Sequence, residues 1–335
     1  MMQARPLGDS SVRVSPVIFG AWAIGGWMWG GQDEQEAISA IHAALDNGIT
    51  TIDTAAVYGM GASEELVGQA IKRRREKVVI ATKCGMRWDS NEGSDPWPNH
   101  DAQGRPIVIR RNSKPDSIIY ECEQSLKRLG VDVIDLFQIH WPDTTTPIED
   151  SMAVMLKLQQ QGKIRAMGVS NYDLDQLSRA KKAAPVASLQ PPYSIIRRHI
   201  EQDLLPYCRK NHIGVIVYSP LERGLLTGAV TPERKFSGDD HRASHPFYTV
   251  ENRKRVVEAL QKIKPIADAH HASFTQVIIN WTIYEPGITA ALVGARNAEQ
   301  AAHNAQAMNL HLSDQERQQI RQAFDETAQV LAAVA

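Results

Sequence analysis

Four side chains with acid–base chemistry directly follow short apolar runs in the first half of the chain. Asp53, Lys83 and His140 each end or directly follow such a run, and Tyr58 comes five residues after Asp53. Taken singly, each has an ordinary explanation, such as a helix cap, a lysine at a strand end or a core histidine. An unpaired charge buried at such a position costs several kcal/mol, so four of them in succession indicate a shared site.

These four residue types suit proton transfer to or from an oxygen atom. A tyrosine hydroxyl has a reference pKa of about 10, which is high for an acid or base near neutral pH. A neighbouring cation lowers that pKa, and Lys83 can supply it while Asp53 keeps the lysine charged. His140 can donate a hydrogen bond to a carbonyl oxygen. Such a set holds no electrons, so a redox role requires a cofactor.

The elements that must position these residues alternate between short apolar runs and amphipathic helices. Runs that are apolar on both faces, each followed by a helix, are typical of parallel strands. Eight of them favour a closed (β/α)8 TIM barrel, whose chemistry lies at the carboxyl ends of the strands. The eight predicted strands are Val17–Gly20, Thr50–Asp53, Val78–Thr82, Ile134–Ile139, Ile164–Val169, Val186–Leu189, Val215–Tyr218 and Thr289–Val293.

The connections between these elements predict one catalytic domain over residues 1–335. Two are long, residues 84–113 after strand three and 219–250 after strand seven, and such long loops in a compact barrel usually bind or cover ligands. The chain has no GxGxxG motif, the fingerprint of a Rossmann dinucleotide-binding domain. The glycine-rich residues 25–31 have a different spacing. An extra C-terminal helix begins with the capping box Ser313-x-x-Glu316, and we expect it to cover one end of the barrel.

The composition excludes several classes of protein. Lys and Arg number 37 and Asp and Glu 38, for a net charge of −1, and no basic stripe for nucleic acid occurs. No apolar stretch reaches the roughly 20 residues that a bilayer requires. The cysteines, Cys84, Cys122 and Cys208, are far apart and form no CxxC, which argues against a disulfide scaffold or a zinc site. Because no signal-peptide core is visible, we expect a cytoplasmic protein without nucleic-acid, membrane or metal partners.

The run Asp53-Thr54-Ala55-Ala56-Val57-Tyr58-Gly59, with Lys83 and His140 downstream, resembles the aldo-keto reductases. The likeness extends from the first strand to Asn304, and within the family it is similar to a bacterial multi-helix branch that acts on small hydroxyaldehydes and polyols. Further matches are Gly168-Val169-Ser170-Asn171, Gln190, Tyr218-Ser219-Pro220-Leu221, Gly224-Leu225-Leu226 and Val293-Gly294-Ala295-Arg296.

The resemblance implies a role for each matching residue. Tyr58 would be the general acid in reduction and the base in oxidation, Lys83 and Asp53 would tune it, and His140 would orient the substrate carbonyl. Family members bind the nicotinamide cofactor in an extended form without a Rossmann domain. The implied cofactor contacts are Ser170, Asn171 and Gln190 for the carboxamide, Tyr218 for the ring, Ser219, Leu221 and Gly224 for the pyrophosphate, and Gly294, Arg296, Gln300 and Asn304 for the adenosine phosphate.

Cofactor preference and substrate size are inferred from charge and from aromatic residues. Arg296 lies near the start of a predicted helix, where a cation and the helix N-terminus favour the 2′-phosphate of NADP(H), and Arg242 is a second candidate contact. We expect the pocket to be walled by tryptophans and to accept small aldehydes and ketones, or in reverse polyols of the glyceraldehyde/glycerol type. The candidate pocket residues are Trp22, Trp27, Trp29 and Trp141.

Two alternatives remain at this point. A Schiff-base aldolase or lyase, or a pyridoxal enzyme, could use Lys83 at a strand end as its nucleophile. The resemblance also covers cofactor-binding regulatory subunits of potassium channels, which keep the four catalytic-type residues. We expect an enzyme, because the chain shows no extra N-terminal segment for such a channel partner and an aldolase would leave the cofactor-binding matches unexplained.

Overall fold

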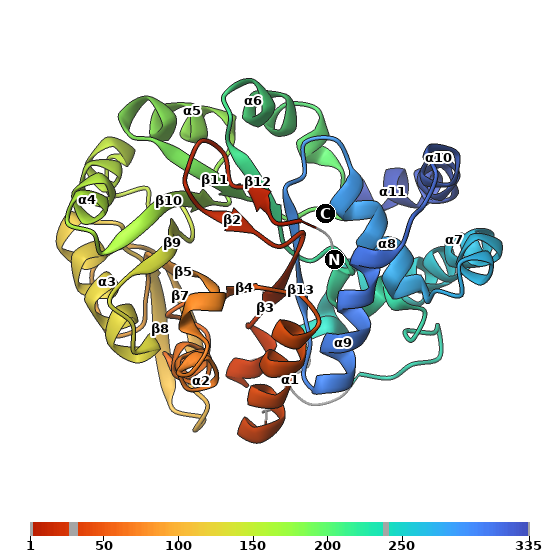
Figure 1. Cartoon of the computed structure of the whole chain (residues 1–335), viewed down its shortest axis with the longest axis horizontal. Helices are drawn as coiled ribbons and strands as arrows, with labels where there is room; N and C mark the ends of the chain where they lie inside the picture. The colour runs from red at the N-terminus through yellow and green to blue at the C-terminus, as the bar shows by residue number, and fades with distance from the viewer. Residues whose placement is uncertain (1–2, 27–32, 237–240, 334–335) are drawn as a thin grey trace.

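A computed structural model describes residues 3–26, 33–236 and 241–333. Eight parallel strands form a closed barrel in which each strand pairs with the next, and the last, β13, pairs with the first, β3 (Figure 1). The barrel predicted from the alternating pattern is therefore confirmed. Its strands are β3 (Val17–Gly20), β4 (Thr51–Asp53), β5 (Val79–Cys84), β9 (Ile134–Ile139), β10 (Ile164–Ser170), β11 (Val186–Gln190), β12 (Gly214–Val217) and β13 (Ala290–Gly294).

Helices surround the barrel and bury their apolar faces against the strands (Figure 1). Local signals set several of their ends: the Asp33 side chain accepts the Glu36 N–H at the start of α1, and Gly130, in the left-handed region with φ 64°, ends α3. The surrounding helices are α1 (Glu34–Asp46), α2 (Ala62–Ile71), α3 (Pro115–Leu129), α4 (Ile148–Gln160), α5 (Leu174–Ala183), α6 (Leu204–Lys210), α7 (Val250–Ala269), α8 (Phe274–Tyr284) and α9 (Ala298–Gln306). Among the residues described, no helix is both long and apolar enough to span a bilayer.

The N-terminal hairpin closes the end of the barrel at which the strands begin. Its strands β1 (Arg5–Pro6) and β2 (Arg13–Val14) pair antiparallel, and Leu7 and Val14 are buried with the inward-facing residues of the barrel, such as Ile18. Figure 1 shows this hairpin, in red, lying across the barrel opening. The opposite end, where the strands finish, is left for a binding site.

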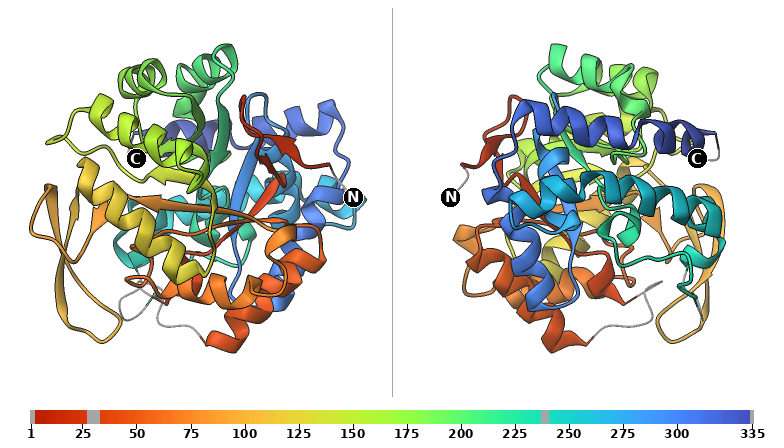
Figure 2. Two further views of the ribbon diagram at one scale, coloured as in Figure 1. Left: turned by 60° about the vertical axis from the view of Figure 1, so that its left-hand side comes forward. Right: turned by 90° about the vertical axis from the view of Figure 1, so that its right-hand side faces the viewer.

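The C-terminal helices do not cover a barrel end, so that expectation was wrong. Helices α10 (Asp314–Ala323) and α11 (Asp325–Ala332) pack against α7 on the outside of the barrel (Figure 2). The indole nitrogen of Trp281, in α8, donates a hydrogen bond to the carbonyl oxygen of Arg317 in α10. Because the hairpin already fills the strand-start end, the apolar face of α10 is buried against the outer helices instead.

Both long connections contain structure that the sequence did not indicate. The first forms an antiparallel sheet in the order β6–β8–β7, from β6 (Met86–Arg87), β7 (Ser94–His100) and β8 (Pro106–Arg111), and it projects from the barrel (Figure 2). Two prolines lie in β7, which is tolerated because β7 is an edge strand. The second contains the short 3-10 helices η4 (Glu222–Thr227), η5 (His241–Ser244) and η6 (Pro246–Tyr248).

Candidate active site

The structure brings the four acid–base residues together at the carboxyl end of three neighbouring strands. Asp53 is the last residue of β4, Lys83 is the second-last of β5, and His140 directly follows β9. Strand β5 pairs with both β4 and β9, so their ends lie side by side. Tyr58 comes from the turn after β4, where its backbone N–H donates to the carbonyl of Ala55.

Lys83 is the centre of this group. Its ammonium nitrogen forms a salt bridge with Asp53 Oδ1, donates to the carbonyl oxygen of Thr54 at 2.8 Å, and lies 3.4 Å from the hydroxyl oxygen of Tyr58. Lys83 and Asp53 are each only 1% exposed. A charge buried to this degree must be paired and hydrogen-bonded to be tolerated, and three acceptors satisfy the three N–H bonds of Lys83.

The second oxygen of Asp53 is held by two glutamine side chains. Gln190 Nε2 donates to Asp53 Oδ2 at 2.9 Å, and Gln138 Nε2 lies 3.3 Å from the same oxygen. Both glutamines are buried. Sequence reasoning missed Gln138, although a signal was present: it precedes His140 by two positions, and side chains two apart in a strand point to the same face.

Opposing effects set the pKa of Tyr58. Burial raises the pKa of the phenol, the charge of Lys83 lowers it, and the charge of Asp53 raises it again, so the net pKa lies above its ordinary value. Burial also lowers the pKa of Lys83, but Asp53 and Tyr58 raise it by more, so the amine stays protonated. The sequence analysis expected Lys83 to lower the pKa of Tyr58, and it does so. Burial and the charge of Asp53 together raise that pKa by more, because both disfavour the phenolate.

His140 is in a position to bind a carbonyl oxygen beside Tyr58. The two rings meet edge to face, with centroids 5.7 Å apart. Burial and then the positive charge of Lys83 hold the pKa of His140 well below its ordinary value. The imidazole is therefore neutral near pH 7, and a neutral imidazole can donate one N–H to a substrate oxygen.

The residues matched to the nicotinamide carboxamide form one hydrogen-bonded network next to His140. Asn171 Nδ2 donates to the carbonyl oxygen of His140 at 3.0 Å and to Ser170 Oγ at 3.1 Å. Ser170 Oγ donates to the carbonyl oxygen of Gln190, and the Tyr218 hydroxyl donates to Asn171 Oδ1 at 2.9 Å. The ring of Tyr218 is thereby held on the side of the barrel next to the acid–base residues.

The turn matched to the cofactor pyrophosphate has an unusual backbone. Ser219, Arg223 and Gly224 have φ values of 58°, 55° and 96°, in the left-handed region that non-glycine residues rarely adopt. Leu221 caps η4, and its carbonyl oxygen accepts the N–H of Gly224 at 3.0 Å. The Arg242 guanidinium lies near Gly224: a Cβ atom there would be 3.9 Å from Arg242 Nη1. Turned backbone N–H groups beside a cation suit an anion, so these residues fit a pyrophosphate.

The residues matched to the adenosine phosphate gather around the start of α9. The N–H of Arg296 donates to Gln300 Oε1 at 2.9 Å, and Asn304 Nδ2 donates to the carbonyl oxygen of Gly294 at 3.2 Å. Arg296 is exposed and directly precedes the helix cap, Asn297. A helix N-terminus with an adjacent cation favours a phosphate group.

Two of the four predicted pocket tryptophans border the acid–base residues. The ring of Trp22 stacks against Tyr58, with centroids 6.2 Å apart, and Trp141 directly follows His140. Trp27 and Trp29 lie outside the described residues. Sequence reasoning missed Ile109 of β8, which packs with Ala55, Val57 and Tyr58; no periodic pattern marks it because the sheet that carries it is irregular.

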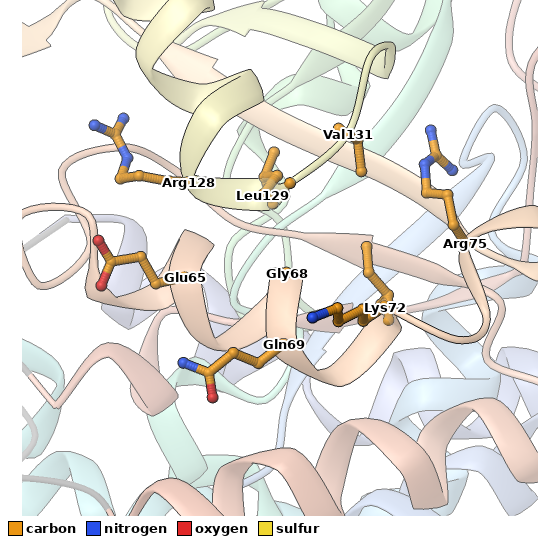
Figure 3. Close-up of a pocket in the computed structure, with 10 residues that line it drawn as sticks. Glu65, Gly68, Gln69, Lys72, Arg75, Arg128, Leu129 and Val131 are labelled. Carbon is orange, nitrogen blue, oxygen red and sulfur yellow. The ribbon is translucent and has the colours of Figure 1, made fainter.

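A separate cavity lies outside the barrel, between α2 and α3. It has a volume of about 390 Å³ and is lined by residues of both helices, among them Glu65, Lys72 and Arg128 (Figure 3). Arg128 Nε donates to the buried carboxylate of Glu64 at 2.6 Å. Because the acid–base residues lie at the carboxyl ends of the strands, this outer groove is no part of their site.

The arrangement can move one proton to or from a substrate oxygen. Tyr58 holds the proton, His140 can donate a hydrogen bond to the same oxygen, and Lys83 can stabilise negative charge on the phenol. The side chains carry no redox group, and the neighbouring network, turn and helix start fit a dinucleotide that spans from Tyr218 to α9.

Comparison with known proteins shows the family of the chain. The model of the aldo/keto reductase family matches residues 16–325. The chain is 38% identical to aldo-keto reductase YhdN of Bacillus subtilis, with 97% of this chain and 95% of the relative covered. It is 39% identical to the NADH-specific methylglyoxal reductase of Escherichia coli, with 93% and 95% covered.

A solved structure gives the same result. The glycerol dehydrogenase AKR11B4 of Gluconobacter oxydans superimposes with a TM-score of 0.86 at 38% identity, over 97% of this chain and 95% of that one. The family match, the relatives and the shared fold each extend over nearly the whole chain. The chain therefore belongs to the aldo-keto reductase family of oxidoreductases.

Proposed function

We propose that the protein is an NADP(H)-dependent oxidoreductase of the cytoplasm that reduces small aldehydes and ketones to alcohols and catalyses the reverse oxidation of small polyols. The observation that carries this proposal is the contact between the Lys83 ammonium and the Tyr58 hydroxyl beside His140. A protonated phenol next to a neutral imidazole suits protonation of a carbonyl oxygen.

The protein's own residues perform the proton transfer. In reduction, His140 donates a hydrogen bond that orients the carbonyl oxygen, and Tyr58 gives its proton to the same oxygen as negative charge develops there. Lys83 stabilises the phenolate that results, and Asp53 keeps Lys83 charged. The nicotinamide, when bound, supplies the hydride. In oxidation the phenolate accepts the alcohol proton.

Preference for the phosphorylated cofactor is inferred from Arg296, which lies exposed at the start of α9. Arg242 lies beside the turn that ends in Gly224, where it would contact the pyrophosphate that both cofactors carry. A guanidinium binds phosphate with two parallel hydrogen bonds. One relative is NADH-specific by name, so the discrimination in this chain depends on its own residues at these positions.

A small substrate is inferred from the aromatic side chains around Tyr58. Trp22 stacks on Tyr58, and Trp141 lies beside His140. The names of two similar proteins refer to three-carbon compounds, glycerol and methylglyoxal.

The proposed location in the cytoplasm, a reducing compartment, agrees with the three cysteines, which are buried and form no disulfide.

The Schiff-base alternative is disfavoured by the surroundings of Lys83. A nucleophilic lysine must lose its proton, and a lowered pKa makes that possible. Here the salt bridge to Asp53 keeps the pKa of Lys83 raised, and all three of its hydrogen-bond positions are used.

A fluorescence titration tests the cofactor part of the proposal. Trp22 lies beside the site, so bound reduced nicotinamide should quench tryptophan emission. We expect saturable quenching by NADPH at lower concentration than by NADH. Tyr58→Phe should bind NADPH like the wild type, because it removes only the reacting hydroxyl. If neither NADPH nor NADH binds, the proposed function is overturned.

A further inference from the structure

The first long connection, residues 85–112 and here called the insert, is fixed to the barrel at both of its ends. At Gly85 the backbone N–H donates to both carboxylate oxygens of Glu121, each at 3.0 Å. The carbonyl oxygen of Gly85 accepts the N–H of Asn112 at 3.1 Å, which joins the two ends. Glu121 belongs to α3 and is 3% exposed.

A second buried carboxylate, Asp143, joins the insert to the segment that carries His140. Its Oδ1 accepts from Ser94 Oγ at 3.0 Å, and its Oδ2 accepts from the backbone N–H of Ser113 at 2.9 Å. Asp143 is 5% exposed. Three further donors come from its own turn: the Thr145 N–H, the Thr145 hydroxyl and the Thr146 hydroxyl. Five hydrogen bonds satisfy the carboxylate. Burial raises its pKa, but the hydrogen bonds from Ser113, Thr145 and Thr146 lower it by more, so the pKa lies below its ordinary value.

The insert that Asp143 anchors borders the reacting residues. Ile109 of the insert packs in one apolar cluster with Val57 and Tyr58. The Arg111 guanidinium lies over the Trp141 ring, 4.8 Å from its centroid. Asp143 itself follows His140 by three residues, and its five hydrogen bonds come from Ser94, Ser113, Thr145 and Thr146. Its influence on a substrate must therefore act through the insert and through Trp141.

We propose that Asp143 is a positioning residue that holds the insert against the His140–Trp141 segment and thereby sets the width of the substrate pocket. The inference rests on the proposed carbonyl reduction. Oδ1 accepts from Ser94 of the insert and Oδ2 from Ser113 directly after it. Each oxygen also accepts a donor from the carboxylate's own turn, so a shift of the insert relative to that turn stretches at least one charge-assisted hydrogen bond. Substrates large enough to contact the insert and Trp141 depend on how these two parts of the pocket are aligned, whereas three-carbon substrates do not.

The test is Asp143→Asn, assayed with methylglyoxal and with the larger para-nitrobenzaldehyde. Ser94 donates to Oδ1 and Ser113 to Oδ2, and an amide places an acceptor oxygen at only one of these two positions, so one of the two hydrogen bonds is lost. We expect KM for para-nitrobenzaldehyde to rise about tenfold, the value of one hydrogen bond to a charged group, with kcat retained. KM for methylglyoxal and the Kd of NADPH should stay at wild-type values.

Two matched variants separate positioning from general damage. Ser94→Ala removes the side-chain link from the insert to Asp143, together with a longer contact of the same hydroxyl, 3.4 Å from Asp95 Oδ2. Thr146→Val removes a donor to the same carboxylate within its own turn. We expect Ser94→Ala to raise KM for para-nitrobenzaldehyde and Thr146→Val to leave it unchanged. Ser94→Ala also carries the test if Asp143→Asn does not fold. Wild-type KM in Ser94→Ala, or an equal rise in Thr146→Val, would overturn the inference, while a wild-type protein that reduces neither aldehyde would instead contradict the proposed function.

Discussion

The ammonium nitrogen of Lys83 lies 3.4 Å from the hydroxyl oxygen of Tyr58 and donates a hydrogen bond to it. This contact stabilises the phenolate, but burial and the charge of Asp53 keep the net pKa of Tyr58 above its ordinary value. The phenol is therefore protonated near pH 7. A protonated phenol is the form required to reduce a carbonyl group, and the phenolate is the form required to oxidise an alcohol.

This protonation state predicts opposite pH profiles for the two directions. Because Tyr58 keeps its proton through neutral pH, kcat/KM for carbonyl reduction should be flat between about pH 6 and 9. Alcohol oxidation should accelerate as the pH rises and the phenol ionises. Steady-state rates in both directions across this range check the prediction. A reduction rate that falls steeply through pH 7 would mean that Lys83 outweighs burial.

His140 should remain neutral at pH values where an ordinary histidine is charged. Burial and the charge of Lys83 both disfavour the imidazolium form. NMR spectra of protein labelled with ¹⁵N in the histidine rings should show His140 still neutral near pH 6, below the reference pKa of about 6.5. His140→Gln identifies the resonances by their disappearance. An imidazolium signal from His140 at neutral pH would contradict its assignment as a neutral hydrogen-bond donor.

The buried carboxyl of Glu121 should make stability depend on pH. Burial raises its pKa to about 8, from an ordinary value of 4.5. Between these values the folded protein retains a proton that the unfolded chain has released, so raising the pH from 5 to 8 destabilises the folded state. Glu121→Gln should remove this dependence, and the free energy of unfolding in urea at several pH values measures it.

The exposed neighbour Glu123 gives the matched control for that experiment. It lies in the same helix and forms a surface salt bridge with Lys163. Glu123→Gln should keep the wild-type decline in stability between pH 5 and 8. If Glu121→Gln and the wild type lose stability equally over this range, Glu121 is not protonated in the folded protein.

Replacement of Arg296 should separate the two cofactors. Arg296→Ala should weaken NADPH binding by roughly 10- to 100-fold, the range expected for a charge-assisted hydrogen bond, and should leave NADH binding nearly unchanged. Arg296→Lys keeps the charge but not the planar guanidinium, so its affinity for NADPH should lie between those of the wild type and Arg296→Ala. Fluorescence titration gives both dissociation constants. Equal losses for the two nucleotides would remove Arg296 from the phosphate site.

The barrel and the acid–base residues could be predicted because local patterns determine them. Continuous apolar runs such as Ile134–Ile139 are typical of strands buried on both faces, and parallel strands place their carboxyl ends together. Asp53, Lys83 and His140 therefore had to meet once the barrel was inferred. The salt bridge of Lys83 with Asp53, and the contacts of Tyr58 with Lys83 and with the His140 ring, confirm that they lie in one group.

The features that were missed depend on contacts between distant parts of the chain. Nothing in the short hairpin around Leu7 shows that it fills a barrel end, and the expectation that the extra C-terminal helix covers one end of the barrel was wrong. The insert has two prolines in β7 and no regular apolar period, so the sequence did not predict its sheet or the apolar cluster that Ile109 forms with Val57 next to Tyr58. The pKa of Tyr58 is a balance between burial and two charges, and a sequence specifies the charges but not the burial.

The most direct test is the consumption of NADPH, followed by its absorbance, with methylglyoxal as the carbonyl substrate. The wild type should turn over, and Tyr58→Phe should lose about 100-fold or more in kcat, as expected for loss of a general acid, while its Kd for NADPH is retained. Trp22→Phe, which keeps an aromatic ring against Tyr58, is the matched control and should keep most of the activity. Near-normal turnover by Tyr58→Phe would contradict the assignment of Tyr58 as the proton donor.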